Sequence, residues 1–298
     1  MQLGFVGLGK MGKGLVMHLL EQGVEVVVWN RSADAVEEVK KFGAIPAATH
    51  AELVSKLTTP RIIWLMVPQG QPVDDMLSSL VPLLSPGDLV VDGGNSFYKD
   101  SLRRSEELLT KKIEFMDIGV SGGPAGARNG ACLMIGGSPE NFVKIKPLAK
   151  LMSAPEAIAH LGAVGAGHFC KMIHNGIEYG MMQAIAEGAA ILKKSDFKLD
   201  LAQVFELYNH QSVITSRLVD WGQKALAGDP ELSQISSKIS ATGEGEWTIN
   251  TAKELNVPTP VISASFQVRQ ESATTPENFS NKMVSALRGQ FGGHPVKK

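Results

Sequence analysis

Short apolar runs alternate with amphipathic stretches over roughly the first half of the chain. The apolar runs are LGFVGL (3–8), VEVVVW (24–29), RIIWLMV (61–67), DLVVDGG (88–94), FMDIGV (115–120) and CLMIGG (132–137). The gaps between the early runs have helical patterns, as in residues 32–43 and 71–84. Strands that are apolar throughout and alternate with helices are typical of a parallel sheet covered on both faces. This half therefore predicts a Rossmann-type, doubly wound α/β domain.

The pattern changes after about Gly167, where the predicted strands stop. Long stretches with helical periodicity take over, beginning with residues 167–194, GHFCKMIHNGIEYGMMQAIAEGAAILKK. Pro258 and Pro260 interrupt the later helices, and the last ten residues, GQFGGHPVKK, are glycine-rich and polar. We therefore predict two domains: an α/β domain over residues 1–165, and an all-helical domain over residues 166–298 that ends in an extended tail.

Composition supports a globular protein and removes several classes of function. The chain has 298 residues, of which 44% are apolar and 20% charged, and a net charge of −1. This length suits two domains, and the balance argues against disorder. Without a basic excess to neutralise phosphates, we expect no nucleic-acid partner. The longest apolar runs, such as residues 62–67, fall far short of the roughly 18 residues that span a membrane.

The N-terminus and the cysteines bear on cellular location. The sequence MQLGFVGLGKMGKG has no basic leader followed by a long apolar stretch, so it does not resemble a signal peptide. Cys132 and Cys170 are the two cysteines, too few for a disulfide framework in a chain of this length. We therefore expect a cytoplasmic protein without a membrane partner.

A glycine motif follows the first predicted strand. Gly7, Gly9 and Gly12 form G-x-G-x-x-G between this strand and a helix. In a dinucleotide site, the first glycine makes a tight turn, the second admits the pyrophosphate and the third permits close helix packing. The helix N-terminus then binds the phosphates. We predict a dinucleotide site rather than an ordinary turn, in which the cofactor also contacts Leu8, Lys10 and Met11.

The end of the second predicted strand bears on the choice of cofactor. A fold selective for NAD usually places a carboxylate there to bind the ribose 2′-hydroxyl. This chain instead has Asn30, Arg31 and Ser32, which can hold a 2′-phosphate. We therefore predict NADP, with NAD as the alternative. The alternative for Arg31 is a solvated residue at a strand end. We also place Met66 and Val67, at the end of the 61–67 run, beside the cofactor.

A polar stripe lies on the first predicted helix of the second domain. Lys171, His174, Asn175 and Glu178 fall at about 0°, 300°, 40° and 340° around a helix that turns about 100° per residue. The stripe brings a cation, an imidazole, an amide and a carboxylate to one side. The alternative is a solvated face with a Lys/Glu pair. The catalytic interpretation is favoured because the stripe directly follows a nucleotide domain.

The rest of this helix allows three further expectations. Met172, Ile173 and Ile177 fall at about 100° to 240° and should face the core. Gly176 and the preceding GAVGAG would let another molecule approach the backbone closely. We expect no metal, because His168 and Cys170 point about 200° apart on a helix and cannot hold one ion together with His174.

Two more candidate segments follow strands of the predicted sheet. Asn95 ends VVDGGNS, and Ser121, Gly122 and Gly123 begin SGGPAGAR. The carboxyl ends of parallel strands present their loops to a ligand, and glycine-rich backbone offers N–H groups to an anion such as a carboxylate. Each segment taken alone is equally consistent with an ordinary turn.

Together these motifs resemble a known enzyme family. GLGKMG, DGGNS, VSGGPAGAR, GAGHFCKMIHNGIEYG, GEGEWT, VISASFQVR and LRGQFGGH are similar to 6-phosphogluconate dehydrogenase, decarboxylating, in its short-chain class. The wider group is the β-hydroxyacid dehydrogenases. The similarity runs in blocks along the whole chain, and KMIHNGIEYG is its most specific part. The resemblance implies oxidation and decarboxylation of 6-phosphogluconate to ribulose 5-phosphate and CO₂ with an NAD(P) cofactor.

The resemblance also implies roles for individual residues. Lys171 would be the general base and acid, and Glu178 the acid that protonates the decarboxylated product. Asn95, His174 and Asn175 would bind the hydroxyl groups and the carboxylate of the substrate, together with Ser121, Gly122 and Gly123. Asn175 would also belong to the catalytic set. The ligands of the substrate phosphate would be Tyr179 and Arg269. Arg288 and His294 would reach into the active site of a neighbouring subunit, which implies a homo-oligomer.

The sequence departs from the family at one segment. Where the longer-chain class reads KGTGKWT, this chain reads TGEGEWT (242–248), so Thr242 replaces a lysine on the phosphate side. With Glu244 beside it, this change leaves part of the phosphate pocket undefined. Two other functions stay open: a β-hydroxyacid dehydrogenase or reductase that does not decarboxylate, and a nucleotide-binding protein without catalysis.

Overall fold

The computed structural model describes residues 1–240, 243–292 and 296, and the chain forms two compact units. Unit 1 is Met1–Met172 and unit 2 is Ile173–Lys298. The division falls inside the long helix α8 (Ala166–Lys194), so this helix begins in unit 1 and continues into unit 2. The predicted boundary, between residues 165 and 166, coincides with the start of that helix.

Unit 1 is built on an eight-stranded sheet of order β3-β2-β1-β4-β5-β6-β7-β8. The strands are β1 (Gln2–Val6), β2 (Glu25–Trp29), β3 (Ile45–Pro46), β4 (Ile62–Leu65), β5 (Leu89–Asp92), β6 (Glu114–Ser121), β7 (Ala131–Gly136) and β8 (Ser153–Gly162). All neighbours are parallel except β6 and β7, which pair antiparallel. The connection between β6 and β7 holds only a short helix and is too short for a parallel crossover.

Two strands escape the pattern of apolar runs. β3 has only two residues, one of which is a proline. β8 is an edge strand with a mostly exposed or half-buried sequence, SAPEAIAHLG. An edge strand needs no continuous apolar run, because solvent reaches it from one side. The other six strands match the predicted runs.

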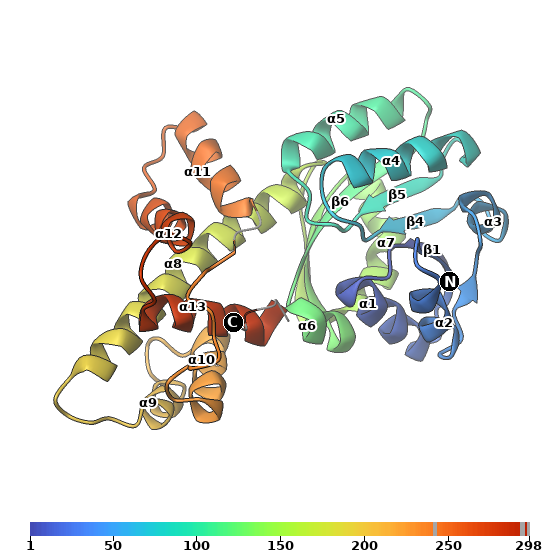
Figure 1. Ribbon diagram of the computed structural model, residues 1–298. Helices are drawn as coiled ribbons and strands as arrows, with labels where there is room; N and C mark the ends of the chain where they lie inside the picture. The colour runs from blue at the N-terminus through green and yellow to red at the C-terminus, as the bar shows by residue number, and fades with distance from the viewer. Residues whose placement is uncertain (241–242, 293–295, 297–298) are drawn as a thin grey trace. The chain divides into compact units, whose positions relative to one another are not determined.

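Helices cover both faces of the sheet (Figure 1). They are α1 (Lys10–Glu21), α2 (Ala33–Lys40), α3 (His50–Ser55), α4 (Gln71–Leu80), α5 (Tyr98–Leu109), α6 (Gly123–Asn129) and α7 (Pro139–Met152), with a 3₁₀ turn at Val81–Leu83. One apolar core joins α1, α2, α6 and α7 to the sheet, and a second joins α3, α4 and α5 to its other face. Neighbouring residues of β4 alternate between these cores, with Trp64 in the first and Ile63 and Leu65 in the second.

This topology places several loops at one edge of the sheet. β2, β1, β4, β5 and β6 are parallel neighbours, so their carboxyl ends point the same way. The chain leaves β1 toward β2 on one side, and β4 lies on the other side, which makes the gap between them a topological switch point. Ligands of open α/β sheets bind at such points.

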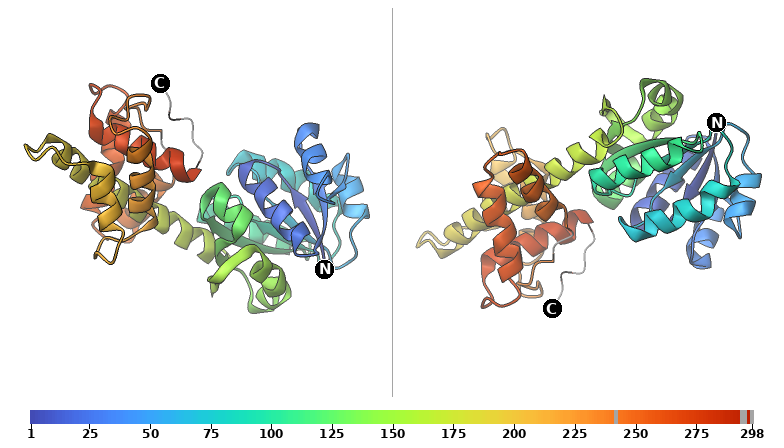
Figure 2. Two further views of the ribbon diagram at one scale, coloured as in Figure 1. Left: turned by 90° about the horizontal axis from the view of Figure 1, so that it is seen from below. Right: turned by 90° about the horizontal axis from the view of Figure 1, so that it is seen from above.

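The described residues of unit 2 form helices joined by loops and contain no strand, as predicted (Figure 2). Besides the rest of α8 it contains α9 (Leu201–Tyr208), α10 (Arg217–Gly228), α11 (Glu244–Glu254), α12 (Pro260–Glu271) and α13 (Phe279–Gly292). Pro260 begins α12, because a first-turn proline lacks only an N–H that would be unpaired anyway. The core comes from one side of α8 and from α9, α10 and α13. No described helix has the length and apolarity to cross a membrane.

The first residues of the expected extended tail are helical. Residues 288–292 continue α13 as helix, and Leu287 is fully buried in the core of unit 2. Phe291 packs on that core and stacks on Trp221. The glycines suggested an extended segment, but apolar contacts at Leu287 and Phe291 stabilise a helix here.

Candidate active site

The glycine motif has the geometry of a dinucleotide cradle. Gly7 has φ +100°, and a Cβ there would lie 2.4 Å from the carbonyl oxygen of Met66. A Cβ at Gly12 would lie 2.1 Å from the carbonyl oxygen of Gly7, so α1 packs directly on the turn. A Cβ at Gly9 would meet no protein atom within 4 Å, so this backbone is open to a ligand. The three positions thus match the three tasks expected of them.

The end of β2 is tied to this turn by Asn30. The side-chain oxygen of Asn30 accepts a hydrogen bond from the Leu8 N–H (2.9 Å), and its Nδ2 donates to the Ser32 carbonyl (3.0 Å). Asn30 therefore shapes the glycine turn and keeps one N–H for a ligand. Arg31 and Ser32 are exposed. Lys10 is exposed and Met11 half-buried in the first turn of α1, where the positive end of the helix dipole lies.

The loops after β4 and β5 contact one another. Met66 and Val67 are half-buried just past the end of β4, and a Cβ at Gly94 would lie 2.4 Å from the Val67 carbonyl oxygen. Asn95 has φ +55°, in the left-handed region. Its side chain pairs with the Val120 backbone, donating from Nδ2 to the carbonyl (3.2 Å) and accepting from the N–H (3.0 Å). The side chain of Asn95 thereby holds its loop against β6.

The turn after β6 belongs to the same edge. Ser121 ends the strand, and Gly122 and Gly123 have φ values of +122° and +63° as the chain turns into α6. Such conformations suit glycine, which has no Cβ. The structure therefore brings together the predicted residues of unit 1 that follow β1, β2, β4, β5 and β6.

Lys171 lies in unit 1, at the start of α8, and only 7% of its surface is exposed. A Cβ at Gly119 of β6 would lie 2.4 Å from the Lys171 Cβ and 3.0 Å from its Cγ. The aliphatic part of the side chain thus crosses β6 at a glycine, next to Val120 and Ser121. Lys171 is not on a solvated face, which removes the alternative interpretation for this residue.

The remaining stripe residues lie on the part of α8 that belongs to unit 2. His174 Nδ1 lies 3.0 Å from Asn175 Oδ1 and 3.8 Å from Glu178 Oε2. The side chains of His174 and Glu178 are 37% and 21% exposed. An imidazole, an amide and a carboxylate are therefore close enough to bind neighbouring hydroxyl groups of one ligand.

Two buried arginines lie beside Tyr179 in unit 2. Arg269 and Arg288 are 3% and 4% exposed. The Arg269 guanidinium lies 3.3 Å above the Tyr179 ring, over its face, and the buried Tyr179 hydroxyl has no hydrogen-bond partner. Arg288 NH1 donates to the carbonyl and hydroxyl oxygens of Ser240. Within the described residues neither guanidinium has a carboxylate at ion-pair distance. We call Tyr179, Arg269 and Arg288 the arginine cluster.

The positive charges of the arginine cluster are only partly offset by nearby groups. The pKa of Arg269 is lowered to about 10, mainly by burial and in addition by the charge of Arg288. Burial also lowers the pKa of Arg288. Both groups stay charged at neutral pH, so the cluster holds two buried cations that repel one another. An anion with several acceptor oxygens would offset this cost.

Glu244 adds one carboxylate near the arginine cluster, and two predicted residues cannot be placed. Glu244 begins α11, and its Oε2 is buried without a hydrogen-bond partner. Tyr179, Glu178 and Glu244 act to raise the pKa of Arg288, against the stronger effect of burial. Glu178 also acts to raise the pKa of Arg269. Thr242 and His294 lie outside the described residues.

Three expectations for α8 are wrong. Ile177, expected in the core, is 52% exposed. The backbone at Gly176 is not open to a ligand, because Thr248 of α11 packs there and a Cβ would lie 2.6 Å from its Cγ2. Gly167 of GAVGAG likewise packs on the sheet, since a Cβ there would lie 2.5 Å from the Asp117 carbonyl oxygen. These glycines allow close packing within the protein. Helical angles alone cannot show which neighbours a face meets.

Buried charges that support the site were not predicted. Asp117, inside β6, accepts hydrogen bonds from the N–H groups of Gly165 (2.6 Å) and His168 (2.7 Å) at the start of α8. Asp92, at the end of β5, meets Arg104 of α5 inside the protein. An acidic residue in an otherwise apolar strand was the available signal, because a buried charge needs a partner. The described residues contain no group of three His, Cys, Asp or Glu side chains that could hold a metal ion.

Family models match both parts of the chain. Residues 2–176 match the NAD binding domain of 6-phosphogluconate dehydrogenase. Residues 167–297 match the 6-phosphogluconate dehydrogenase C-terminal domain. The glycine cradle lies within the first match and the arginine cluster within the second, and Lys171 belongs to both.

Relatives match the chain over its full length. The Bacillus subtilis protein YqeC is 43% identical over 298 residues, which are 100% of both chains. A 6-phosphogluconate dehydrogenase of Haloferax volcanii, NAD(+)-dependent and decarboxylating, is 39% identical and covers 100% of this chain and 99% of its own. The solved Plasmodium falciparum 6-phosphogluconate dehydrogenase, studied with NADP⁺ and with 6-phosphogluconate, matches with a TM-score of 0.83 at 30% identity. That match covers 96% of this chain and 70% of the other.

Proposed function

The chain belongs to the 6-phosphogluconate dehydrogenase family, and we propose that it converts 6-phospho-D-gluconate to D-ribulose 5-phosphate and CO₂ while hydride passes to NADP⁺. The observation that carries the proposal is the arginine cluster, whose two buried cations call for a multiply charged anion. A phosphate provides that charge, and its oxygens can also accept from the unpartnered Tyr179 hydroxyl.

Unit 1 would hold the cofactor. The open backbone at Gly9 fits a pyrophosphate, and residues 10–12 in the first turn of α1 direct N–H groups toward it. The exposed Arg31 and Ser32 suit a 2′-phosphate, and no carboxylate follows β2 at residues 30–32 to repel one. NADP is therefore the proposed cofactor, with NAD as the alternative that the Haloferax relative uses. When bound, the nicotinamide accepts a hydride.

Residues of α8 would carry out the proton transfers. Lys171 takes the proton of the carbon-3 hydroxyl while the hydride leaves that carbon. Burial of the lysine favours this, because desolvation disfavours an ammonium ion. The resulting ammonium then polarises the new carbonyl, the bond to the carboxyl carbon breaks, and CO₂ leaves with the electron pair retained on the enediolate.

The last step needs an acid at another point of the substrate. Glu178 lies two helical turns beyond Lys171, about 10.5 Å along the axis of α8. It would protonate the enediolate carbon from which CO₂ left, which is carbon 2 of the substrate and carbon 1 of the product. His174 and Asn175, which contact one another beside Glu178, would bind hydroxyl groups. Asn95 and the Ser121-Gly122-Gly123 turn would bind the carboxylate side from unit 1, and Asn95 would also contact the cofactor.

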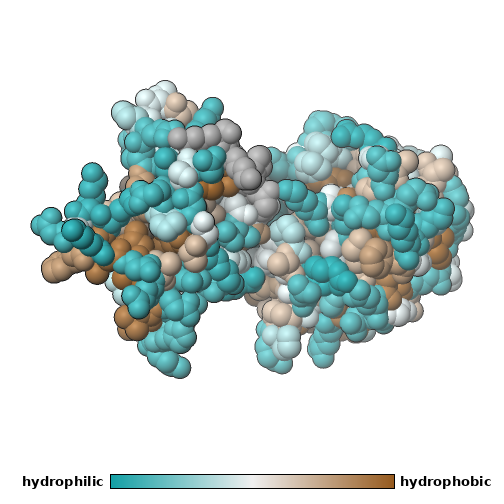
Figure 3. Space-filling model, turned by 60° about the horizontal axis from the view of Figure 1, so that its bottom comes forward, coloured by the Kyte–Doolittle hydropathy of each residue, from teal (hydrophilic) through white to brown (hydrophobic). Residues whose placement is uncertain are grey.

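We further propose a homo-oligomer. Large apolar side chains are exposed along the outer part of α8 and the segments that follow it, including Ile177, Met181, Ile191, Phe197, Leu207 and Ile214. Figure 3 shows apolar side chains on the visible face of unit 2. The family resemblance implies that the end of the chain completes a neighbouring site, whereas Arg288 is buried in its own chain. A protein truncated after Leu287 keeps Lys171 but lacks the end of the chain, and a Lys171→Met subunit keeps the end of the chain but lacks the lysine. Activity should return when the two are mixed only if the end of one subunit completes the site of the other.

One coupled assay tests the proposed reaction. The protein is given 6-phosphogluconate labelled with ¹³C at carbon 1 together with NADP⁺, and labelled CO₂ and NADPH are measured in one vessel. We expect equal amounts of both products. NADPH without CO₂ would identify a dehydrogenase that does not decarboxylate. If neither product forms, the alternative of a nucleotide-binding protein without catalysis is favoured. Unphosphorylated gluconate serves as the control for the arginine cluster and should react far more slowly.

A further inference from the structure

A fully buried arginine lies behind the loops that follow β4 and β5. Arg104 of α5 is 0% exposed and is among the largest completely buried side chains. Its guanidinium makes three contacts: Nε to Asp74 Oδ1 (2.8 Å), NH2 to the Gly70 carbonyl (2.9 Å) and NH1 to Asp92 Oδ2 (3.4 Å). Asp74 and Gly70 belong to the start of α4, and Asp92 ends β5. One planar group therefore joins two neighbouring segments.

Asp92 passes this connection on to the loop that carries Asn95. Its Oδ1 accepts from the Gly94 N–H (3.0 Å), and its Oδ2 accepts from the buried Ser96 hydroxyl (2.7 Å). The residues on both sides of Asn95 are thus held by one carboxylate, which is itself fully buried. Asn95 has a positive φ, so its backbone depends on such restraints.

The two loops also contact one another directly. A Cβ at Gly94 would lie 2.4 Å from the Val67 carbonyl oxygen, and one at Gly93 would lie 2.4 Å from Trp64 Nε1. There is no room between these segments, so a shift of one moves the other. The side chain of Asn95 continues the chain of contacts to Val120, next to Ser121.

We propose that Arg104 is a positioning residue that sets the placement of Asn95 relative to Val67. Through Asp92 it holds the loop proposed to bind substrate, and through Gly70 and Asp74 it holds the loop proposed to face the cofactor. Arg104 is fully buried, so it would touch neither ligand. Its effect falls on the approach of the reacting atoms, because a displacement of about 1 Å can slow a reaction about 10²-fold. This inference rests on the proposed function for its kinetic part.

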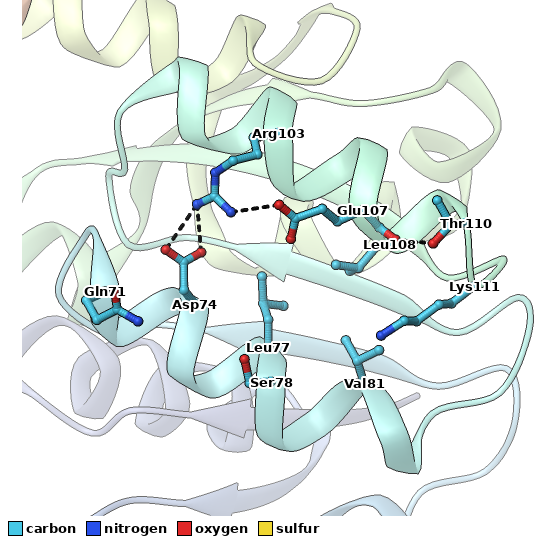
Figure 4. Close-up of a pocket in the computed structure, with 10 residues that line it drawn as sticks. All are labelled: Gln71, Asp74, Leu77, Ser78, Val81, Arg103, Glu107, Leu108, Thr110 and Lys111. Carbon is cyan, nitrogen blue, oxygen red and sulfur yellow. Dashed lines mark hydrogen bonds and ion pairs between the residues drawn. The ribbon is translucent and has the colours of Figure 1, made fainter.

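The neighbouring arginine provides a matched control. Arg103 donates to both oxygens of Asp74 (2.9 and 3.0 Å) and to Glu107 (2.9 Å), as Figure 4 shows. It borders an outer hollow of about 650 Å³ between α4 and α5 and is partly exposed. It shares helix, charge and partner Asp74 with Arg104, but its hydrogen bonds reach neither Asp92 nor Gly70. Arg103→Lys therefore perturbs the ion pairs of Asp74 but leaves the connection from Arg104 through Asp92 to Asn95 intact.

The first readout is hydrogen exchange of the whole protein without ligands. In Arg104→Lys, which keeps the charge but loses the planar fork, residues 66–70 and 93–97 should exchange at least about threefold faster, and distant segments should not. Arg103→Lys should match the wild type in both loops. Unchanged loop exchange in Arg104→Lys, or equal changes in both variants, would overturn the proposal. If Arg104→Lys does not fold, Asp92→Asn, which removes the carboxylate partner, is measured in its place.

The second readout is the deuterium isotope effect with 6-phosphogluconate labelled at carbon 3. We expect Arg104→Lys to lower kcat about 10²-fold with a larger isotope effect, while KM for NADP changes less than threefold. A variant that merely folds less well would lose kcat with the isotope effect unchanged, and that result would overturn the proposal. A wild-type protein that does not oxidise 6-phosphogluconate would instead refute the proposed function, and the exchange comparison would still decide the role of Arg104.

Discussion

The cofactor loops of unit 1 and the arginine cluster of unit 2 are held by opposite means. In unit 1, neutral side chains pair with backbone groups: Asn30 with Leu8, and Asn95 with Val120. In unit 2, Arg269 and Arg288 are buried, mutually repelling cations without a carboxylate at ion-pair distance among the described residues. The cofactor loops are thus complete without their ligand, whereas the arginine cluster is electrostatically incomplete.

This difference separates stability from binding. A loop held by satisfied hydrogen bonds gains stability and shape from the same contacts, because an unpaired buried polar group is costly. A buried charge without a partner destabilises the free protein, and the ligand that neutralises it then binds more tightly. Substitutions in the two units should therefore change stability in opposite directions.

The largest effect is expected where α8 passes from unit 1 to unit 2. Lys171→Met should lower kcat by about 10²–10⁴, the usual contribution of general acid–base catalysis, while cofactor affinity stays nearly unchanged. Steady-state kinetics and NADPH titration measure the two quantities. The control is Lys193→Met, which lies near the other end of the same helix and pairs with Glu231. Turnover like that of the wild type in Lys171→Met would refute its role as base.

The next effect tests the arginine cluster. Arg269→Met should raise KM for 6-phosphogluconate about 10- to 150-fold, because a charged hydrogen bond is worth about 1.5–3 kcal/mol. The melting temperature should stay equal or rise, since a buried cation is removed. Arg217→Met, an exposed arginine over Trp221, is the matched control. A marked loss of stability in Arg269→Met would show that the cluster is compensated without ligand.

Arg269 also predicts how the affinity for the substrate changes with pH. The pKa of Arg269 is about 10, so its charge is lost as the pH rises through that value. In wild-type protein, affinity for the phosphorylated substrate should weaken there. In Arg269→Met the remaining affinity should show a smaller change over the same range.

A smaller effect is expected for Arg31, the exposed arginine of the proposed cofactor site, on the affinity for NADP. Arg31→Gln should weaken NADP binding about 10-fold or more, because a hydrogen bond between charged groups is worth about 1.5–3 kcal/mol. NAD binding should change little, and both are measured by titration. An equal loss for both cofactors would place Arg31 against the adenine or within the fold. A wild-type preference for NAD would contradict the interpretation.

The last prediction tests whether substitutions in the cofactor loops of unit 1 lower the stability of the protein. Asn30→Ala leaves the Leu8 N–H without its acceptor and should cost about 1–3 kcal/mol in the free energy of unfolding, with weaker cofactor binding. Urea unfolding measures the loss. Asn129→Ala, whose exposed side chain donates to the Ala125 carbonyl, should cost much less. Equal losses would remove the contrast between the units.

Much of the fold could be predicted because strong periodic signals determine it. Six apolar runs became strands of the sheet, and residues 167–194 became α8. β3 and β8 carried no such signal, and the antiparallel direction of β7 follows from a short connection rather than from its residues. Ile177 faces solvent because the core of unit 2 lies on another side of α8 than its angle suggested.

By itself, the sequence determined the local features of this protein: the glycine turn after β1, the stripe on α8 and the positions where loops leave the strands. These depend on residues near one another in the chain, whose spacing sets their geometry. Only the tertiary structure decided which distant groups meet: Lys171 across Gly119, Arg269 over Tyr179, and Arg104 between Asp92 and Gly70. Burial and long-range partners set the electrostatics of a charged side chain, and both come from packing that no spacing encodes.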